Sequence, residues 1–257
     1  MIDNKQKLDV PLIEIKLMEI KLMEELKRIC EKHSMHYCFG YGSVLGAIRH
    51  EGFIPWDTDI DIYVSIDEYD DFCSILNQEA SNEYSVFSYN NNEEYSQLFA
   101  RFGYKIYGDS DIHIDIFPLV GAPTNKLAKK VLSLLNYVNY RLFHVKLYSK
   151  NVVFKDNGKK YFLSKLINIL TFFIEAKMQK RIYKYFAFLF PIKESKELYN
   201  LCSSYGMREF IPKKWYFDTT KKKFESLEVL VPLEWDEYLK HFYGDYMTPR
   251  KTNYLSK

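Results

Sequence analysis

The alternation of aspartate with apolar residues in one short segment limits the fold of this chain more than any other feature. The segment "WDTDIDIYV" places Asp57, Asp59 and Asp61 at every second position. Side chains alternate between the two faces of a strand. Asp59 and Asp61 therefore share one face of a predicted strand, and the isoleucines between them point to the other face. Asp57 joins the aspartate face if the extended conformation begins that early.

A fourth aspartate has the same setting further along the chain. Asp115, in "HIDIFPL", also lies between isoleucines. If its strand neighbours the first one, three carboxylates converge, and two unit charges at ~4 Å repel by roughly 4 kcal/mol at a surface-like dielectric. Either one carboxyl group takes up a proton or a divalent cation lies among them. Such oxygen ligands suit Mg²⁺ or Mn²⁺. The pattern favours metal-dependent phosphoryl or nucleotidyl transfer, and surface aspartates without catalytic function are the alternative.

The elements around the aspartates can be placed from hydrophobic periodicity. Apolar residues at three- and four-residue steps predict a helix over residues 11–33, and a short strand follows at 37–39. Ser43, in a Gly-Ser turn, is expected to open a short helix whose N-terminus is suited to bind phosphate. A strand is predicted at 59–64, followed by a helix capped by Ser65.

The rest of the chain divides into three predicted parts. Strand-like runs occur within 84–89, 96–107 and 112–117, and the period then becomes helical from 126 to about 201. We therefore predict an α/β (α+β) fold, with a mixed sheet flanked by helices. The predicted units are a catalytic core at 1–125, a basic amphipathic helical insertion at 126–200, and a C-terminal segment at 201–257 that completes the core.

Charge is distributed unevenly along the chain. The net charge is +2, yet residues 126–184 hold 14 Lys and Arg against 2 Asp and Glu, a balance of +12 that leaves −10 for the remainder. One apolar stripe of this segment consists of Leu127, Val131, Leu134, Val138, Leu142 and Val145, and a second runs from Phe162 to Met178. Such helices can lie on an anionic membrane, so we expect peripheral contact through 126–184. The alternative is a subdomain packed on the core with a solvated basic face.

Several classes of protein are disfavoured by composition and pattern. The four cysteines form no C-x-x-C pair and fit a reducing compartment better than a disulfide framework. The N-terminus lacks the apolar region of a signal peptide, and the apolar runs are short of the roughly 20 residues that span a membrane. Basic residues form no nucleic-acid-reading motif, so nucleic acid is not an expected partner. We expect a cytoplasmic protein with peripheral contact at the inner face of the plasma membrane.

The order of these elements resembles the nucleotidyltransferase fold of the polymerase-beta-like superfamily. More narrowly, "GSVLGAIRHEGFIPWDTDIDIYV" is similar to the signature of the LicD family, which includes the fukutin-related proteins. The resemblance extends weakly to "IHIDIFPL" and returns at "YGDYM" near the end of the chain. The family often has three consecutive aspartates where this chain has Asp57, Thr58 and Asp59.

The resemblance implies an activity. A LicD-type enzyme would transfer phosphocholine, or a related phospho-substituent, from a CDP-linked donor to a hydroxyl of a cell-surface glycan precursor, and release CMP. Teichoic acid, capsule and lipopolysaccharide are the expected acceptor classes, with a lipid-linked precursor favoured. Two rival functions remain open: a nucleotidyltransferase that moves an NMP to a small molecule and releases pyrophosphate, and a non-catalytic membrane-associated scaffold.

The resemblance also implies roles for individual residues. By motif match, Asp59, Asp61 and Asp115 would bind Mg²⁺ or Mn²⁺, and Asp115 would in addition accept the proton of the acceptor hydroxyl. Gly42 and Ser43 would hold phosphate through backbone N–H groups and the serine hydroxyl.

Three further polar residues, Arg49, His50 and His113, are candidates near this site, and Asp57 is expected to contact the substrate. Arg49 offers a fork to phosphate, and His50 can hydrogen-bond phosphate or Asp57. Both can equally be surface residues at a helix end. His113 lies two residues before Asp115, so we expect it to share the face of that aspartate.

A choline donor would need aromatic faces, because quaternary ammonium groups are usually held by aromatic rings. The candidates are Trp56, Trp215, Tyr216, Trp235 and Tyr243. With 17% aromatic residues in the chain, packing in the core is the competing explanation for each of them.

Overall fold

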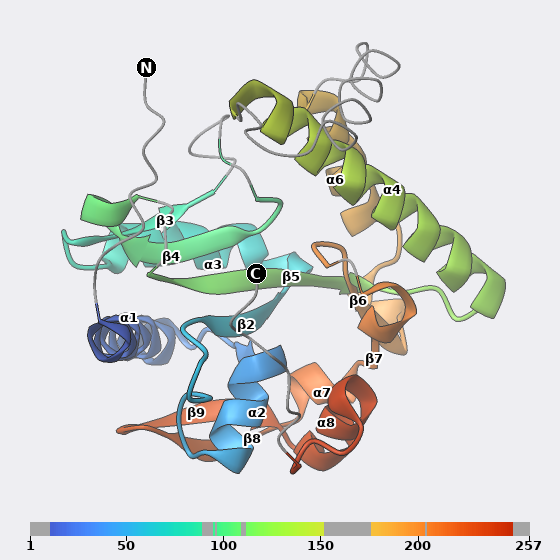
Figure 1. Ribbon diagram of the computed structural model, residues 1–257. Coiled ribbons are helices and arrows are strands. Elements are labelled where there is room, and N and C mark those ends of the chain that lie inside the picture. Colours follow the sequence, from blue (N-terminus) through green and yellow to red (C-terminus); the bar gives the residue numbers. More distant parts are fainter. Residues whose placement is uncertain are drawn as a thin grey trace, which may run out of the picture.

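The computed structural model describes residues 11–88, 95, 97–108, 112–151, 176–203 and 205–248 (Figure 1). The α-helices in these ranges are α1 (Leu12–His33), α2 (Tyr41–Arg49), α3 (Ile66–Glu79), α4 (Lys126–Asn151), α6 (Ala176–Ala187), α7 (Lys214–Phe217) and α8 (Trp235–Tyr243). Three 3₁₀ turns accompany them: η1 (Lys105–Tyr107), η2 (Ile192–Glu194) and η3 (Gly206–Glu209).

The strands form a mixed sheet and a separate hairpin. The sheet contains β1 (Cys38–Phe39), β2 (Ile60–Ser65), β3 (Tyr84–Phe87), β4 (Ala100–Tyr104), β5 (His113–Gly121), β6 (Glu197–Asn200) and β7 (Phe210–Pro212), and the hairpin pairs β8 (Thr219–Phe224) with β9 (Leu227–Pro232). Its order is β1-β2-β5-β4-β3, and β6 and β7 continue from the end of β5. Among the described strands of this sheet, β2 and β5 form the one parallel pair. The predicted α/β class with a mixed, helix-flanked sheet is confirmed.

The N-terminal helix forms as its periodicity predicts. The buried side of α1 carries Leu22, Met23, Leu26 and Ile29, which are fully buried in the main core. The helix ends where Ser34 takes a left-handed conformation and its N–H donates to the carbonyl of Cys30. This helix lies against α3 and β5, so it reaches the strand that carries Asp115.

Two boundaries around the aspartate segment differ from the sequence prediction. Helix α2 begins at Tyr41, after Gly40, rather than at Ser43. Strand β2 begins at Ile60, so Asp57 and Asp59 precede it, and the N–H of Asp57 closes a turn onto Ile54. The alternation rule therefore holds for Asp61 inside the strand, whereas a turn decides the position of Asp57.

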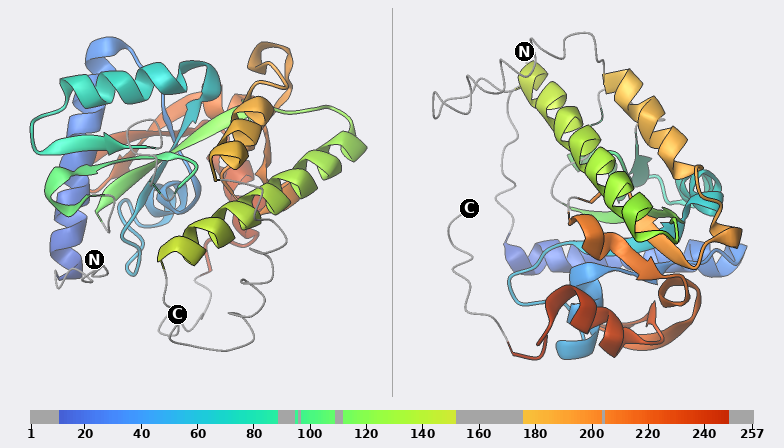
Figure 2. Two further views of the ribbon diagram at one scale, coloured as in Figure 1. Left: turned by 90° about the horizontal axis from the view of Figure 1, so that it is seen from above. Right: turned by 90° about the vertical axis from the view of Figure 1, so that its right-hand side faces the viewer.

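The helical part of the insertion is shorter than predicted. Residues 192–200 form a 3₁₀ turn and strand β6, which pairs with the end of β5, because this stretch completes hydrogen bonds that β5 offers beyond β2. Of the second predicted stripe, only Met178 falls within the described residues. Figure 2 shows α4 and α6 side by side, and the two helices contact each other.

Helix α4 presents its faces in the opposite sense to an ordinary surface helix. Ser133, Asn136 and Asn139 are buried toward the protein, together with Leu132 and Phe143. The predicted apolar stripe faces outward instead: Leu127, Val131, Leu134 and Val138 are exposed, as is Leu135 beside them. The inner polar side chains find partners, since the Asn136 amide donates to the Tyr199 hydroxyl and the Ser203 carbonyl.

The C-terminal elements share the main core with the N-terminal ones. In Figure 1 the β8–β9 hairpin, α7 and α8 gather with α2 below the sheet. Phe224, Val229 and Tyr238 are buried in the same cluster as Phe39 and Ile62. No helix among the described residues combines the length and apolar character needed to cross a lipid bilayer.

Candidate active site

The parallel β2–β5 pair brings two of the predicted aspartates together. Asp61 and Asp115 are partners in the register, so their Cα atoms lie side by side on adjacent strands, about 4.8 Å apart in the hydrogen-bonding direction. Register partners point to the same face of a sheet. The two carboxylates therefore share one face, as expected if the two strands are neighbours.

Asp115 is held by two basic side chains. Its Oδ1 accepts a hydrogen bond from Arg101 Nε at 2.9 Å and lies 3.0 Å from His113 Nε2. Arg101 is the register partner of Asp115 on β4, and its guanidinium also lies over the Phe99 ring. Asp115 is buried, so these contacts fix its orientation. The structure confirms that His113 shares its face. Sequence reasoning missed Arg101, although a single charge in the apolar run "LFARFGY" was a signal.

The aspartates on the first segment are electrostatically crowded. Burial raises the pKa of Asp61 well above its usual range, and the charges of Asp59, Asp115 and Asp57 raise it further, whereas Arg101 lowers it. Burial, together with a hydrogen bond to Asp59 and its charge, raises the pKa of Asp57 to about 7. Asp59 is exposed. The group is thus open to solvent at Asp59 and becomes more buried toward Asp61 and Asp115.

A fifth acidic residue, Glu19 of α1, also belongs to this region. It is fully buried, and its Oε1 accepts the backbone N–H of His113 at 3.0 Å, while its Oε2 has no hydrogen-bond partner among the described residues. Burial raises its pKa well above the usual range, and the charges of Asp59, Asp115 and Asp61 add to the shift. The sequence held a signal, because Glu19 falls on the apolar stripe of its helix.

Lys16, one turn before Glu19, holds the loop that precedes β2. Its Nζ donates to the carbonyls of Ile54 at 3.2 Å and Pro55 at 3.1 Å. Its charge also lowers the pKa of Asp57, against the larger effect of burial. Helix α1 therefore contributes a cation and a carboxyl group to the site, and the sequence analysis anticipated neither.

Ser43 positions Asp61 through its hydroxyl. The Ser43 Oγ accepts the backbone N–H of Asp61 at 2.8 Å, and the Ser43 N–H donates to the carbonyl of Gly40. Both groups that were expected to hold phosphate thus make internal hydrogen bonds, because α2 begins two residues earlier than predicted. Gly42 faces Asp57: a Cβ at this position would lie 2.9 Å from Asp57 Oδ2. Its role at phosphate stays a prediction.

Residues from later parts of the chain hold Tyr41, the first residue of α2. It has a left-handed backbone with φ of 40°, which is uncommon for a bulky residue. Its N–H donates to the Tyr238 hydroxyl at 2.8 Å, and its own hydroxyl donates to Glu209 Oε2 at 2.5 Å and accepts from Asn200. These contacts offset the backbone strain. They therefore help to set the position of Tyr41, and with it the first turn of α2, which contains Gly42.

Arg49 and His50 lie at the other end of α2. Seven residues of helix separate Gly42 from Arg49, which corresponds to about 10 Å. Arg49 donates to His50 Nε2 at 2.9 Å and to the carbonyl of Tyr246 at 2.6 Å. Burial, then the charges of Arg49 and Lys16, lower the pKa of His50. The structure thus brings the pair to the C-terminal segment, and their predicted phosphate contact stays a prediction.

The aromatic candidates separate into core residues and site residues. Trp215 and Tyr216 are buried in the main core, where the Trp215 indole donates to Glu234 and the Tyr216 hydroxyl accepts the N–H of Ser65. For both rings the structure supports the competing explanation, which is packing in the core. Trp235 packs against the core beneath the Lys222 ammonium, and Trp56 is 47% exposed.

Two tyrosines remain near the aspartates. The pKa of Tyr243 is raised by burial first and then by the charge of Asp61, and the pKa of Tyr205 is raised by burial and then by the charges of Glu209 and Asp61. Both phenols therefore lie within electrostatic reach of the carboxylates. Tyr243 was a sequence candidate, whereas Tyr205 in "SSYGM" carried no pattern that singled it out.

The carboxylates of this region match a divalent cation only in a sparse arrangement. Among the residues that the structure describes, no group of three or more His, Cys, Asp and Glu side chains is arranged to hold a metal ion. Mg²⁺, however, is usually held by one or two carboxylates, with substrate phosphates and water completing its shell. The crowded Asp59 and Asp61 carboxyl groups beside Asp115 fit that sparser arrangement.

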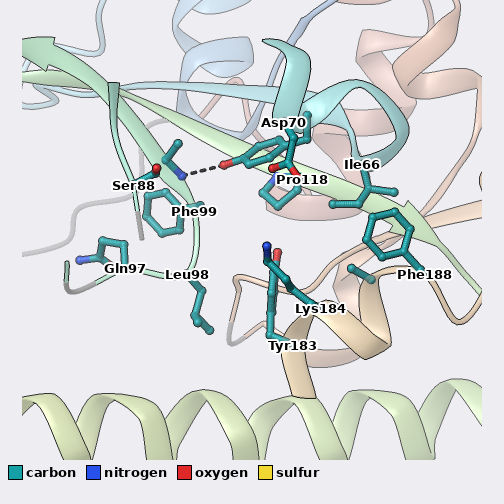
Figure 3. Close-up of a pocket in the computed structure, with 13 residues that line it drawn as sticks. Ile66, Asp70, Ser88, Gln97, Leu98, Phe99, Pro118, Tyr183, Lys184 and Phe188 are labelled. Carbon is teal, nitrogen blue, oxygen red and sulfur yellow. Dashed lines mark hydrogen bonds between the residues drawn. The ribbon is translucent and has the colours of Figure 1, made fainter. Parts of the chain in front are cut away.

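A separate cavity lies away from the aspartates. It has a volume of about 90 Å³ and is lined mainly by apolar groups from α3, the residues before β4, and α6, among them Ile66, Leu98, Phe99 and Phe188 (Figure 3). The Tyr69 hydroxyl at its wall accepts the N–H of Ala100 at 2.6 Å. Its lining combines residues of the core with residues of α6, so the cavity lies at the junction between the core and the insertion. No aspartate of the site lines it.

Two comparisons with known proteins bear on this geometry. Residues 34–146 match the model of the "LicD/FKTN/FKRP, nucleotidyltransferase domain", a range that contains Ser43, Asp61 and Asp115. The chain is also 29% identical over 236 residues to the lipopolysaccharide cholinephosphotransferase LicD of Haemophilus influenzae, covering 85% of this chain and 84% of that protein. The aspartate face between β2 and β5 thus lies inside the segment that is similar to the LicD-family nucleotidyltransferase domain, and the similarity to a LicD protein extends over most of the chain.

Proposed function

We propose that this protein is a LicD-type phosphotransferase that moves phosphocholine, or a related phospho-substituent, from a CDP-linked donor to a hydroxyl of a cell-surface glycan precursor. The observation that carries the proposal is the similarity to a lipopolysaccharide cholinephosphotransferase over most of both chains. It is supported by the Asp61–Asp115 pair within the matched domain, because paired carboxylates beside a helix start are suited to diphosphate chemistry.

In the proposed reaction, the acceptor oxygen forms a bond to the phosphorus that carries choline. The bond from that phosphorus to the CMP oxygen breaks, CMP leaves, and the hydroxyl proton passes to Asp115. Arg101 and His113 hold Asp115 in one orientation, so that its free oxygen can face the acceptor. Asp59 and Asp61 would hold Mg²⁺ or Mn²⁺ beside Asp115. When bound, the cation would supply neutralisation of charge on the diphosphate.

The transferred group is proposed to lie against Tyr205 and Tyr243. Both rings come from the C-terminal part of the chain and lie within electrostatic reach of Asp61. Aromatic faces attract a quaternary ammonium group. Since Tyr205 is 65% exposed, its ring is accessible to a bound substrate.

The test is a product analysis with the purified protein. CDP-choline, CDP-ribitol, CDP-glycerol and nucleoside triphosphates are each incubated with Mg²⁺ or Mn²⁺ and with lipopolysaccharide, teichoic acid or capsule acceptors. We expect CMP and phosphocholine-modified glycan, and loss of both with EDTA. Release of pyrophosphate from a triphosphate would assign nucleotidyl transfer instead. No turnover of any donor, in a protein that folds, would favour the scaffold.

A matched pair of variants tests the site. Asp61→Asn should lower transfer about a thousandfold, the effect of losing ~4 kcal/mol of transition-state stabilisation. The variant should keep or raise the melting temperature measured without metal, because it removes a carboxyl group whose ionisation is disfavoured by burial and by the charges of Asp59 and Asp115. Asp71→Asn, on the exposed side of α3, is the control and should change neither value. Near-normal turnover of Asp61→Asn would show that the site is wrongly assigned.

A further inference from the structure

The outward face of α4 is apolar over at least three turns. Leu127, Val131, Leu134, Leu135 and Val138 recur at three- and four-residue steps and are exposed, with Leu127 70% and Leu134 62% exposed. Side chains at this spacing form one continuous stripe along a helix. Figure 2 shows the helix at the surface of the molecule. Contiguous apolar surface of this kind marks an interaction site in proteins.

The exposure of this face follows from the way in which the opposite side of α4 packs. The opposite side of α4 packs against the protein through polar residues: Ser133, Asn136 and Asn139 are buried there. At the N-terminus of α4, Asn125 Oδ1 caps the helix by accepting the N–H groups of Leu127 and Ala128. The polar hydrogen bonds fix the rotation of α4 about its axis, and that rotation directs the leucines outward.

The charges beside the stripe select the kind of partner. The α4 sequence holds Lys126, Lys129, Lys130, Arg141, Lys146 and Lys150 and no acidic residue. Lys129 is engaged by Glu197 and lies over the Phe210 ring, whereas Lys126, Lys130 and Arg141 are exposed beside the stripe. A second copy of the chain on this face would oppose two basic segments, which costs free energy. An anionic surface satisfies both the apolar stripe and the charge.

We infer that α4 docks the protein in the plane of an anionic lipid bilayer, with Leu127, Val131, Leu134, Leu135 and Val138 among the acyl chains and Lys126, Lys130 and Arg141 at the headgroups. The inference goes beyond the phosphotransferase proposal and does not depend on it, since it concerns a surface that contains none of the aspartates.

The test is flotation of the full chain with vesicles. Vesicles of neutral phosphatidylcholine are compared with vesicles that contain about 30 mol% phosphatidylglycerol, at about 0.1 M and about 0.5 M NaCl. We expect the protein to float with the anionic vesicles at least ~10-fold more than with the neutral ones, and less at high salt because the charges are screened. Failure to float with anionic vesicles at low salt overturns the inference.

Two pairs of variants distinguish binding through α4 from non-specific hydrophobic binding and from non-specific electrostatic binding. Leu127→Glu with Leu134→Glu should abolish flotation, whereas Ile106→Glu, at a 77% exposed apolar residue on η1, should not. Lys126→Glu with Lys130→Glu should reduce flotation, whereas Lys105→Glu with Lys221→Glu should leave most of it. Thermal melts confirm that each variant folds.

Two further results would contradict the inference. Flotation that survives the double leucine variant would place the membrane contact elsewhere. A dimer in solution that this variant disrupts, with no binding to vesicles, would make the stripe an interface between copies. The phosphotransferase assay with a water-soluble acceptor should be unaffected by the leucine variants, so the two proposals fail independently.

Discussion

Two buried serines of this protein make the same kind of hydrogen bond in different places. Ser43 Oγ accepts the N–H of Asp61 at 2.8 Å, and Ser65 Oγ accepts the N–H of Asp67 at 3.3 Å at the start of α3. Both side chains are almost fully buried. They therefore form a matched pair in which only one member touches the proposed site.

This pair yields a prediction at the residue scale. Ser43→Ala and Ser65→Ala should each lower the free energy of unfolding by about 1–2 kcal/mol, because each leaves a backbone donor without its acceptor. Only Ser43→Ala should also lower kcat, since it releases the start of β2 beside Asp61. Chemical denaturation and initial-rate assays measure the two effects. Equal loss of activity in both variants would mean that Ser43 acts through stability alone.

At the scale of elements, the turn of the β8–β9 hairpin supports the loop that carries Asp57. The Glu225 N–H donates to the carbonyl of Glu51 at 2.7 Å, and the Phe53 N–H donates to Glu225 Oε1 at 3.1 Å. On its other side the loop presses against α2: a Cβ on Gly46 would lie 2.5 Å from the carbonyl oxygen of Gly52. Hairpin, loop and helix are thus packed without space for one extra methyl group.

Gly46→Ala should therefore separate α2 from the loop. We expect a loss of about 1–3 kcal/mol in the free energy of unfolding, as for other overpacked sites, and a fall in kcat because Asp57 and Gly42 move apart. Gly108→Ala is the control: its φ is +65° but no atom lies within 4 Å of the added Cβ, so it should cost only the backbone strain of about 1 kcal/mol and leave kcat unchanged. Thermal melts and initial rates compare them, and an unaltered Gly46→Ala protein would contradict the packing argument.

At the scale of the whole molecule, several acidic side chains are buried in the core and at the site, and burial raises the pKa of each. Glu209 accepts hydrogen bonds from Ser203 and Tyr41, and burial nonetheless raises its pKa to about 7. Glu19 and Asp61 are raised in the same direction by burial. For an acid whose pKa is raised on folding, the folded state binds more protons than the unfolded state between the two pKa values.

Stability without metal should therefore fall as the pH rises from about 4.5 toward about 7, by up to ~1.4 kcal/mol per pH unit for each such acid. Glu209→Gln removes one titrating group, and its stability should change less across this window. Denaturation curves at intervals of pH measure the slope. A stability that increases from pH 4.5 to 7, or an identical slope in the variant, would contradict the assigned direction. Glu237→Gln, on an exposed residue of α8, is the control and should keep the slope.

Much of the architecture could be predicted from short-range patterns of apolar and polar residues. The stripe of α1, the isoleucines around Asp61 and Asp115, and the Ser65 cap are local signals, because each depends on a period of two or 3.6 residues. They were sufficient for the fold class and for the two aspartate strands. The motif from Gly42 to Val64 was specific enough to indicate the family before any coordinates.

Periodicity and motif thus predicted most helices and strands and the two strands that carry aspartates, since both are properties of neighbours in the chain. Packing between distant elements determined that Arg101 holds Asp115, that Lys16 and Glu19 approach from α1, and that α4 turns its leucines outward. These contacts join residues from different elements, 14 positions apart in the chain for Arg101 with Asp115 and 94 positions apart for Glu19 with His113. The burial of a polar group, not its local pattern, fixes where it points.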